Sequence, residues 1–379
     1  MQTQRALREH DLSELLNGLK VAVAHEWIAA RAGSEQVFEV LCQALPTADL
    51  YALSWDPKVA MDTGGRKITT TFLDNRVLRD RRGLSLPIMP LAWSALGGGD
   101  YDLVLSSHHA FAHSNHLAGE GVQLSYVHSP ARYVWVPEID ERGSSRWAAP
   151  ARAALKRVDL AASKRVTDYA ANSSAVRSRI AECWGRDSRI IHPPVRTEFF
   201  GHDRPSAPAC DYVLGVGRWI GYKRFDLIVQ IAELAGLPLK IAGRGPERAA
   251  IESAARSAKV PVELIESPSD EDLRQLYQHA RCLIFPTFED FGMVPVESLA
   301  AGTPVVAFAA GGALDTITHG KTGFLARSEN PAEFAELVGR IDELDRGACA
   351  EAAEAFSAAH FKSQIYEWIR EALIGRQHD

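Results

Sequence analysis

The chain of 379 residues is 46% hydrophobic and 24% charged, a balance typical of a globular protein of about two domains and unlike that of a disordered one. It has no apolar run of the ~18 residues that a membrane helix needs and no apolar core of a signal peptide, so we expect a cytoplasmic protein. Its five cysteines are scattered and form no CxxC motif, so we expect neither disulfides nor structural zinc. The net charge of −6 is uneven, with 24 Lys and Arg against 22 Asp and Glu in residues 1–200 and 18 against 26 in residues 201–379, which suggests that the halves meet different partners.

Apolar runs typical of strands alternate with helical patterns along the whole chain, which predicts an α/β protein with parallel sheets. In the first half we expect strands at 19–24, 103–106 and 123–127, and helices at 34–44, 149–168 and 174–183. A Pro-rich stretch, residues 192–208, then predicts a linker.

The alternation restarts after this stretch. We expect strands at 212–216, 239–242, 262–265, 282–285 and 305–308, and helices at 224–235, 247–258, 271–279, 296–300 and within 350–374. The pattern predicts two doubly wound Rossmann-like domains, residues 1–195 and 196–360, with helix 361–379 packing back onto the first. Such sheets bind ligands at the carboxyl ends of their strands, so a cleft between the two domains is the expected site.

Two glutamates, Glu289 and Glu297, flank the start of a predicted helix in the second half. Pro295 is typical of a first helical turn and Gly302 of a helix end, so the helix should begin near Val294, with Glu289 in the loop before it and Glu297 in its first turn. Carboxylates beside the amides of a helix N-terminus can hold the hydroxyls of a ribose or a sugar. Alternatively, Glu297 only caps the helix.

The segment from Gly215 to Lys223 joins a predicted strand to a predicted helix. Gly217 would let the backbone approach a phosphate, and Arg218 and Lys223 could neutralise a diphosphate. A tight turn with solvated cations is the plain alternative. A dinucleotide site is not expected, because the predicted strand at 239–242 is followed by Gly-Arg and lacks the acidic residue that holds an NAD ribose. A further glycine turn, residues 309–315, follows a later strand and should face the same end of the cleft. The alternative is a plain turn without a ligand.

Histidines follow two predicted strands of the first half. His128 lies in Tyr-Val-His-Ser-Pro-Ala-Arg-Tyr-Val-Trp, and His108 and His109 lie in Ser-Ser-His-His-Ala. At the carboxyl end of a sheet an imidazole could bond a ligand, but a structural histidine, or a solvent-exposed one in the second case, explains the pattern as well.

Together these segments resemble family 4 of the glycosyltransferases, which are retaining enzymes of the GT-B fold, and Glu289 to Glu297 matches that family's E-x7-E signature. The resemblance implies that Glu289 and His128 contact the donor sugar, that Glu297 holds the nucleotide ribose, and that Arg218 and Lys223 bind the diphosphate. It also implies donor contacts from the backbone at Gly33, Gly217, Gly292, Met293 and Val294, and acceptor contacts from His109 and Arg132. The family's Gly-Gly-Ala-Glu loop is altered here to Ala-Gly33-Ser-Glu, so the geometry at Gly33 is open.

The His128 and Glu289 segments are most similar to those of bacterial mannosyltransferases that build O-antigen or exopolysaccharide, which makes GDP-mannose the first expected donor. The expected acceptor is lipid-linked or a saccharide, and no metal, other cofactor or nucleic acid is expected. A UDP- or dTDP-sugar donor, an isomerase or hydrolase, and a non-enzymic sugar-binding module stay open. A metal-dependent transferase would need a DxD motif, but Asp100-Tyr-Asp102 precedes its strand and lies at the wrong sheet end.

Four arginines, Arg76, Arg79, Arg81 and Arg82, precede an apolar segment, residues 84–93. Basic residues beside exposed apolar ones could rest on the cytoplasmic face of an anionic membrane. A solvated helix end followed by a core segment is the alternative.

Overall fold

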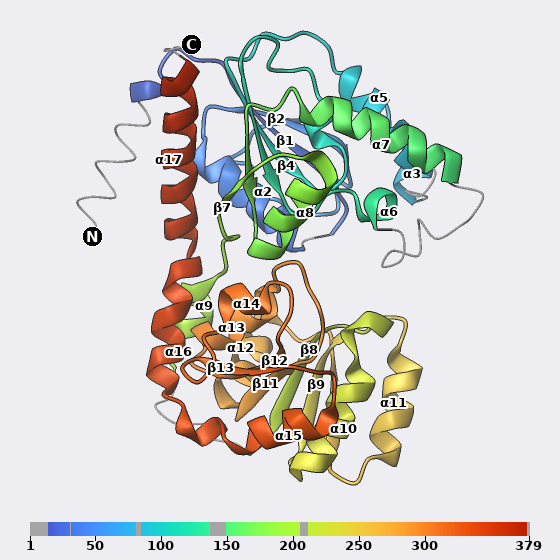
Figure 1. Cartoon of the computed structure of the whole chain (residues 1–379), viewed down its shortest axis with the longest axis vertical. Helices are drawn as coiled ribbons and strands as arrows, with labels where there is room; N and C mark the ends of the chain where they lie inside the picture. The colour runs from blue at the N-terminus through green and yellow to red at the C-terminus, as the bar shows by residue number, and fades with distance from the viewer. Residues whose placement is uncertain (1–13, 31, 81–84, 137–148, 205–210, 377–379) are drawn as a thin grey trace. The chain divides into compact units, whose positions relative to one another are not determined.

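A computed structural model describes residues 14–30, 32–80, 85–136, 149–204 and 211–376. The chain forms two compact units, Met1–Pro194 with Phe361–Asp379, and Val195–His360 (Figure 1). The division falls one residue from the expected boundary after residue 195, and the last helix belongs to the first unit. The expected cleft between the units stays a prediction.

The first unit contains a parallel sheet of seven strands in the order β3-β2-β1-β4-β5-β6-β7. The strands are β1 Val21–Ile28, β2 Asp49–Trp55, β3 Ile68–Thr70, β4 Leu103–His108, β5 Val122–Val127, β6 Asp168–Ala171 and β7 Arg189–Ile190. The direction of winding reverses between β1 and β4, which is the topological switch point of a doubly wound sheet.

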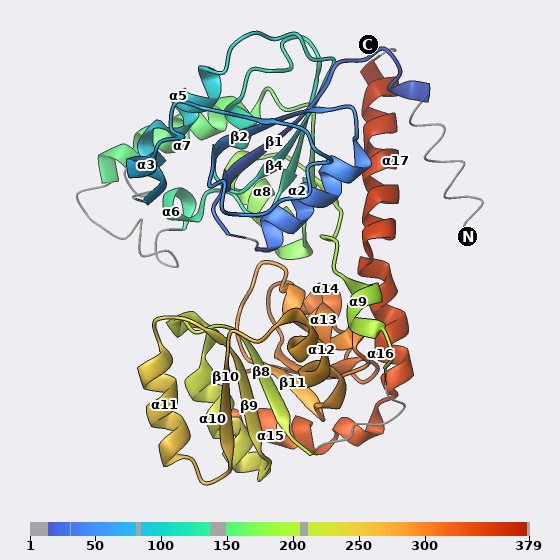
Figure 2. The ribbon, with the colours of Figure 1, turned by 180° about the vertical axis from the view of Figure 1, so that it is seen from behind.

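Helices cover both faces of this sheet (Figures 1 and 2). They are α2 Gly33–Ala44, α3 Arg76–Asp80, η1 Leu86–Ile88, α5 Met89–Ser94, η2 Ala112–Ser114, α6 Arg132–Trp135, α7 Ala149–Ser163, α8 Ser174–Trp184 and α17 Ala358–Arg376. Helix α17 lies beside α2, where the Tyr366 hydroxyl donates to the Ala44 carbonyl over 3.4 Å. Its buried side chains, Phe361, Ile365, Trp368, Ile369 and Leu373, belong to the same apolar core as strands β1, β4 and β5.

The second unit contains a parallel sheet of six strands in the order β10-β9-β8-β11-β12-β13, with its switch point between β8 and β11. The strands are β8 Val213–Arg218, β9 Leu239–Arg244, β10 Val262–Glu266, β11 Cys282–Phe285, β12 Val305–Phe308 and β13 Gly323–Ala326. The helices are α9 Thr197–Gly201, η5 Gly221–Lys223, α10 Phe225–Ala235, α11 Arg248–Ser257, α12 Asp270–His279, α13 Met293–Ala300, α14 Ala313–Thr316, α15 Pro331–Gly339, η6 Ile341–Glu343, α16 Arg346–Ala353 and η7 Glu354–Phe356. Helices α10, α11 and α15 pack on one face, and α9, α12 and α13 on the other (Figure 1).

Several sequence-based boundaries were wrong. Strands β1 and β4 run further than predicted, to Ile28 and His108, because their polar ends are buried between neighbouring strands. The helix predicted at 149–168 ends at Ser163, and Asp168 instead opens β6. Strands β2, β3, β6, β7 and β13 were not predicted at all.

The stretch predicted as a linker is largely part of the second unit. Val195 and Phe200 are buried in its core, and α9 packs against α12 and α13. The division between the units does fall within this stretch, but its prolines mark irregular backbone that is packed and not a free linker. Residues 205–208 of this stretch lie outside the described residues.

In the part of the chain that the structure describes, none of the helices combines the length and apolar character that crossing a bilayer requires. The described cysteines, Cys42, Cys183, Cys282 and Cys349, are free thiols.

Candidate active site

Two groups of polar side chains lie at or beside the switch points of the two sheets, one group in each unit, and each group contains predicted site residues. In the second unit Arg218 ends β8 and Glu289 follows β11, the two strands that flank the switch point. In the first unit His25 and Ser107 lie on β1 and β4, and His128 follows β5. Helices start on opposite faces at a switch point and leave room for a ligand at the strand ends, so both groups lie where such sheets bind ligands.

Lys223 and Glu289 form an ion pair in the second unit, although they are 66 residues apart. Lys223 ends η5 and its side chain is only 9% exposed. Burial, together with the charge of Arg218, lowers the pKa of Lys223 to about 8, and the Glu297 carboxylate opposes this shift. Arg218 itself is exposed at the end of β8. The turn therefore places two cations and a carboxylate at one sheet end, as a diphosphate sugar would require.

Backbone contacts hold Glu289 in place. The Thr287 hydroxyl donates to the Tyr222 carbonyl over 2.7 Å, which ties the loop after β11 to η5. The Gly312 amide donates to the Glu289 carbonyl over 2.9 Å, and a Cβ at Gly311 would collide with that carbonyl. The glycine turn at 309–315 is thus more than a plain turn, because its small residues support the loop that carries Glu289.

Helix α13 begins at Met293, one residue before the predicted start, and Gly292 is its N-cap with φ +83°. Gly292, Met293 and Val294 therefore form the helix N-terminus, where free amides favour an anion. Glu297 is consequently in the second turn and not in the first. The alternative that it caps the helix was wrong, because its carboxylate instead contacts Tyr277 of α12.

Tyr277 donates from its hydroxyl to Oε2 of Glu297 over 2.9 Å. The Tyr277 side chain is fully buried, and the Thr303 hydroxyl fixes its backbone by donating to its carbonyl over 2.6 Å. Burial raises the pKa of Glu297, whereas the Tyr277 hydroxyl and the Arg196 charge lower it. This arrangement occupies Oε2 and leaves Oε1 as the oxygen that could accept from a ligand hydroxyl.

Gly217 has φ +153° next to Lys223, with the Lys223 side chain 3.6 Å from where a Cβ would stand. This left-handed backbone is open to glycine and strained for other residues.

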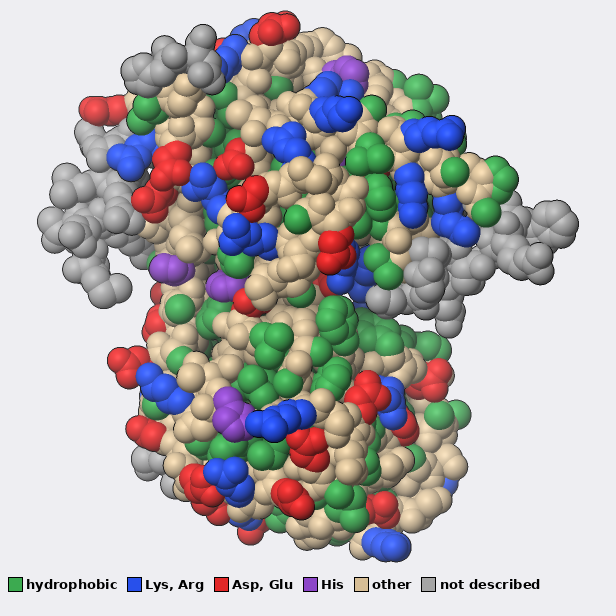
Figure 3. Space-filling model, viewed as in Figure 1, with side chains coloured by type: hydrophobic (Ala, Val, Ile, Leu, Met, Phe, Trp, Pro, Cys, Tyr) green, Lys and Arg blue, Asp and Glu red, His purple; other side chains and the backbone are tan. Residues whose placement is uncertain are grey.

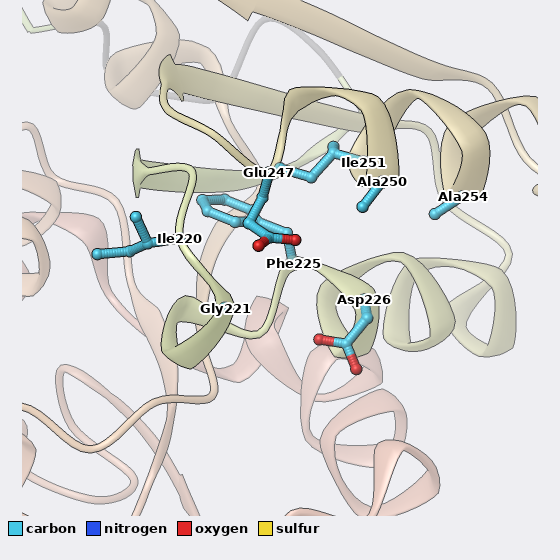
Figure 4. Close-up of a pocket in the computed structure, with 8 residues that line it drawn as sticks. All are labelled: Ile220, Gly221, Phe225, Asp226, Glu247, Ala250, Ile251 and Ala254. Atoms are coloured by element: carbon cyan, nitrogen blue, oxygen red, sulfur yellow. The ribbon is translucent and has the colours of Figure 1, made fainter. Parts of the chain in front are cut away.

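A cavity of about 160 Å³ opens beside the same turn, between α10 and α11 (Figure 4). Ile220 and Gly221 line it near η5, with Phe225 and Asp226 from α10 and Ile251 from α11. It is smaller than the ~300 Å³ at which pockets for drug-sized ligands begin. We therefore assign ligand binding to the polar strand ends and not to this cavity.

In the first unit three side chains form a hydrogen-bonded chain. His25 Nδ1 lies 3.0 Å from Ser107 Oγ, and Ser107 Oγ lies 2.9 Å from His128 Nε2. Burial lowers the pKa of His25 to about 3 and that of His128 to about 4, so both rings are neutral near pH 7.

Glu26, next along β1, organises the loop after β4. Its Oε1 accepts from the amides of Ala110, Phe111 and Ala112 over 3.0, 2.8 and 2.7 Å. Burial raises the pKa of the Glu26 carboxyl to about 7, and these amides oppose the shift. The loop it holds begins with His109, directly after β4.

The remaining predicted residues differ in their surroundings. His109 is partly buried, its ring 4.4 Å from that of Trp27 and 6.3 Å from that of His128. His108 is fully buried in β4, so the exposed-histidine alternative was wrong for it. Arg132 is exposed at the start of α6, and Gly33 is the first residue of α2, whose Phe38 stacks on the His25 ring.

Sequence reasoning missed His25, Glu26, Ser107 and Tyr277. A signal existed for the first two, since a His-Glu pair interrupts an otherwise apolar strand. No local pattern marked Ser107 or Tyr277, because their partners are 21 and 20 residues away along the chain.

Comparisons with known proteins bear on the fold and on the second half of the chain. Residues 204–358 match the family model described as "Glycosyl transferases group 1". The D-inositol 3-phosphate glycosyltransferase of Mycobacteroides abscessus is 30% identical over 170 residues, which are 40% of this chain and 38% of that protein. The match thus spans under half of the length of this curated relative.

Solved structures match nearly the whole chain. Anabaena Alr3699/HepE, crystallised with UDP and glucose, has a TM-score of 0.68 at 17% identity, with 93% of this chain and 99% of that chain covered. Sucrose-phosphate synthase from Thermosynechococcus elongatus has a TM-score of 0.69 at 19% identity, with the same coverage. The predicted GT-B fold is confirmed, and residues 204–358 are similar to group 1 glycosyl transferases.

Proposed function

We propose that this protein is a retaining glycosyltransferase that moves a hexosyl group from a nucleotide diphosphate sugar to a lipid-linked or saccharide acceptor, in the synthesis of a cell-surface polysaccharide or glycolipid. The observation that carries the proposal is the Lys223–Glu289 ion pair beside Arg218, at the switch point of the second sheet. This group lies within the segment that matches the glycosyl transferase family model.

The proposed roles follow from charge and geometry. Arg218 and Lys223 bind the donor diphosphate and stabilise the negative charge that grows on it as the glycosidic bond breaks. Free amides at Gly292, Met293 and Val294 add to this stabilisation, so we propose that no divalent metal is needed. A cation array that acts mainly in the transition state raises kcat rather than affinity alone.

The carboxylates bind hydroxyl groups. Glu297 holds the ribose through the oxygen that Tyr277 leaves open, and Glu289 contacts the hexose. In the first unit, His128 contacts the donor sugar and Gly33 the diphosphate, while His109 and Arg132 contact the acceptor. In the family that the motifs resemble, the acceptor is thought to attack the face that the leaving diphosphate vacates, which gives retention without an enzymic nucleophile.

GDP-mannose is the first candidate donor, since the His128 and Glu289 segments resemble those of bacterial mannosyltransferases. A UDP-hexose is the second candidate, favoured by the neighbour crystallised with UDP and glucose. Incubation with GDP-mannose, UDP-glucose and other donors, scored by nucleotide released with and without membrane extract, distinguishes these donors. Release that needs no acceptor would instead favour a hydrolase, and binding without any release a sugar-binding module.

Site variants test the assigned roles. Lys223→Ala should lower kcat about a hundredfold or more, because a charge-assisted contact to the leaving group is lost. Glu289→Ala should also lower turnover, whereas Glu297→Ala should mainly raise the donor KM.

Full activity in EDTA is expected, and loss that Mn²⁺ restores would contradict metal independence. A β-linked product from an α-linked donor would contradict retention.

Contact with the cytoplasmic face of a membrane is a further part of the proposal. Phe72, Val77 and Leu91 are 56%, 63% and 63% exposed, and apolar and basic side chains are interspersed where α3, α5 and α7 lie (Figure 3). Arg79, however, pairs with Asp74, and much of segment 84–93 is core. Arg81 and Arg82 lie outside the described residues. Sedimentation with anionic liposomes should occur at low salt and weaken as salt rises; its absence at low salt would refute the contact.

A further inference from the structure

The chain of His25, Ser107 and His128 is held by the backbone of three adjacent strands. In the sheet register His25 of β1 is opposite Ser107 of β4. The His128 amide donates to the His108 carbonyl over 2.8 Å, which continues the pairing of β5 with β4 beyond the end of β5. The three side chains are thus brought together by strand pairing and not by a flexible loop.

Few hydrogens are available to the hydrogen bonds that join His25, Ser107 and His128. A serine hydroxyl has one hydrogen to donate and can accept from others, and a neutral imidazole has one N–H and one bare nitrogen. If the Ser107 hydroxyl donates to one ring, its oxygen is left to accept from the N–H of the other. Each of the two contacts, His25 with Ser107 and Ser107 with His128, then has one hydrogen between its two polar atoms.

This count couples the two rings. If His25 donates from Nδ1, Ser107 donates to Nε2 of His128, and His128 carries its hydrogen on Nδ1. If His128 donates from Nε2, Ser107 donates to Nδ1 of His25, and His25 carries its hydrogen on Nε2. In both cases the two histidines have the same tautomer.

The surroundings favour neutral rings. Ser107 and His25 are fully buried, and the His25 ring stacks on Phe38 with centroids 5.0 Å apart. Among the described residues, Nε2 of His25 has no hydrogen-bond partner, which disfavours a cation there. Burial lowers the pKa of both rings, as noted above.

We propose that Ser107 and His25 are positioning residues for His128, which fix its ring and match its tautomer to that of His25. Because Ser107 occupies Nε2, the ligand meets His128 through Nδ1. The tautomer set by His25 then decides whether His128 offers the donor sugar a hydrogen-bond donor or an acceptor. The role at the sugar rests on the proposed function, whereas the coupling of the rings does not.

Nitrogen-15 NMR of the histidine-labelled full-length protein at pH 7 tests the coupling, since protonated and bare ring nitrogens give separate signals. The signals are assigned with His25→Phe and His128→Gln. We expect single neutral tautomers at His25 and His128, with the hydrogen on the same nitrogen in both. Opposite tautomers, a mixture in either ring, or a cationic ring would overturn the proposal.

Three serine variants sharpen the test. Ser107→Ala should give a tautomer mixture at His128, and Ser107→Thr, which keeps the hydroxyl, should restore the single form. Ser125→Ala is the matched control, because Ser125 is equally buried on β5 and its hydroxyl has no partner among the described residues. An unchanged His128 tautomer in Ser107→Ala, or an equal change in Ser125→Ala, would overturn the proposal.

Activity gives a second measurement. With an active donor, Ser107→Ala should lower kcat roughly fivefold, the effect of one positioning hydrogen bond, and Ser107→Thr should recover most of it. Unchanged turnover in Ser107→Ala would overturn the role at the sugar and leave the coupling to the NMR result. Absence of activity with every donor would count against the proposed function, and the NMR result would stand independently of it.

Discussion

The hydrogen bond from Tyr277 occupies one oxygen of Glu297, and the other oxygen is the one proposed to hold the ribose. Tyr277→Phe removes the hydroxyl that donates to Oε2 with almost no loss of volume. We expect the donor KM to rise about tenfold with kcat nearly unchanged, since the ribose is held alike in the ground and transition states. Steady-state kinetics with the active donor measures this.

The matched control is Tyr212→Phe, because the Tyr212 side chain is also buried in the second unit and its hydroxyl donates to the backbone carbonyl of Leu276 over 2.8 Å. An equal rise in KM in this control would show that the loss comes from general destabilisation of the unit.

Lys223 predicts an alkaline limit to activity. Its pKa is lowered to about 8 by burial and Arg218, so its positive charge is present below about pH 8 and lost as pH rises through that value. The kcat/KM for the donor, which reports on the free enzyme, should therefore fall above about pH 8. In Lys223→Arg the charge persists at all these pH values, so this fall should vanish even if the maximum is lower. The same fall in both proteins would assign it to another group.

Glu26 predicts a pH-dependent stability. The pKa of its carboxyl in the folded protein is about 7, above the ordinary value of 4.5. The neutral carboxyl therefore stabilises the folded protein at low pH, and this stabilisation is lost as pH rises through 7. Relative to the wild type, Glu26→Gln should gain roughly 2–3 kcal/mol of unfolding free energy between pH 5 and pH 8.

Urea unfolding at several pH values measures this difference. The buried histidines around Glu26, including His108 with Nδ1 at 3.9 Å, are present in both proteins, so that only their interaction with the Glu26 charge differs. Glu120→Gln, at an exposed position of the same unit, is the control for the loss of one carboxylate. A flat difference for Glu26→Gln would contradict the assignment.

At the scale of elements, one side chain closes the C-terminal end of α2. The Arg66 guanidinium donates to the carbonyl of Cys42 in the last turn of α2 and to the carbonyls of Leu45 and Ala48 just beyond the helix. Arg66→Ala should cost about 1–3 kcal/mol of unfolding free energy, and Arg66→Lys should recover part of it, because an ammonium cannot reach all three oxygens at once. Denaturant unfolding measures both.

Arg177→Ala is the control for this prediction. Arg177 pairs with Asp187 on the exposed surface of the same unit, where an ion pair contributes little. A loss in Arg177→Ala as large as that in Arg66→Ala would contradict the capping role.

At the scale of the whole molecule, the last helix is part of the first core. Trp368 is fully buried there, and its Nε1 donates to Asp168 over 2.8 Å. Trp368→Ala should destabilise the first unit by about 3–5 kcal/mol. Hydrogen exchange should therefore accelerate in β1, β4 and β5 and stay unchanged in the strands of the second unit.

Ile374→Ala lies on the same helix at an exposed position and should leave exchange in both units unaltered. Acceleration confined to the second unit in Trp368→Ala would contradict the assignment of α17 to the first core.

The sequence by itself determined the features that depend on neighbours along the chain. Alternating apolar runs predicted two successive α/β domains, because strand and helix periods are local properties. Strands β11 and β12 were predicted with the observed bounds, and the Glu289–Glu297 motif was found because glycine, proline and glutamate stand close together. Short or polar elements such as β3 and β7 were missed, because sheet pairing rather than local pattern makes them strands.

Only the tertiary structure decided which side chains meet. His25 and Ser107 are 82 residues apart, Lys223 and Glu289 are 66 apart, and Tyr277 and Glu297 lie on different helices. Parallel strands are joined by long crossovers, so residues that share a sheet end are far apart in sequence, and strand order, which no local pattern encodes, sets their contacts. Burial acts in the same way, since the lowered pKa of Lys223 and the raised pKa of Glu26 come from packing around them and not from their neighbours along the chain.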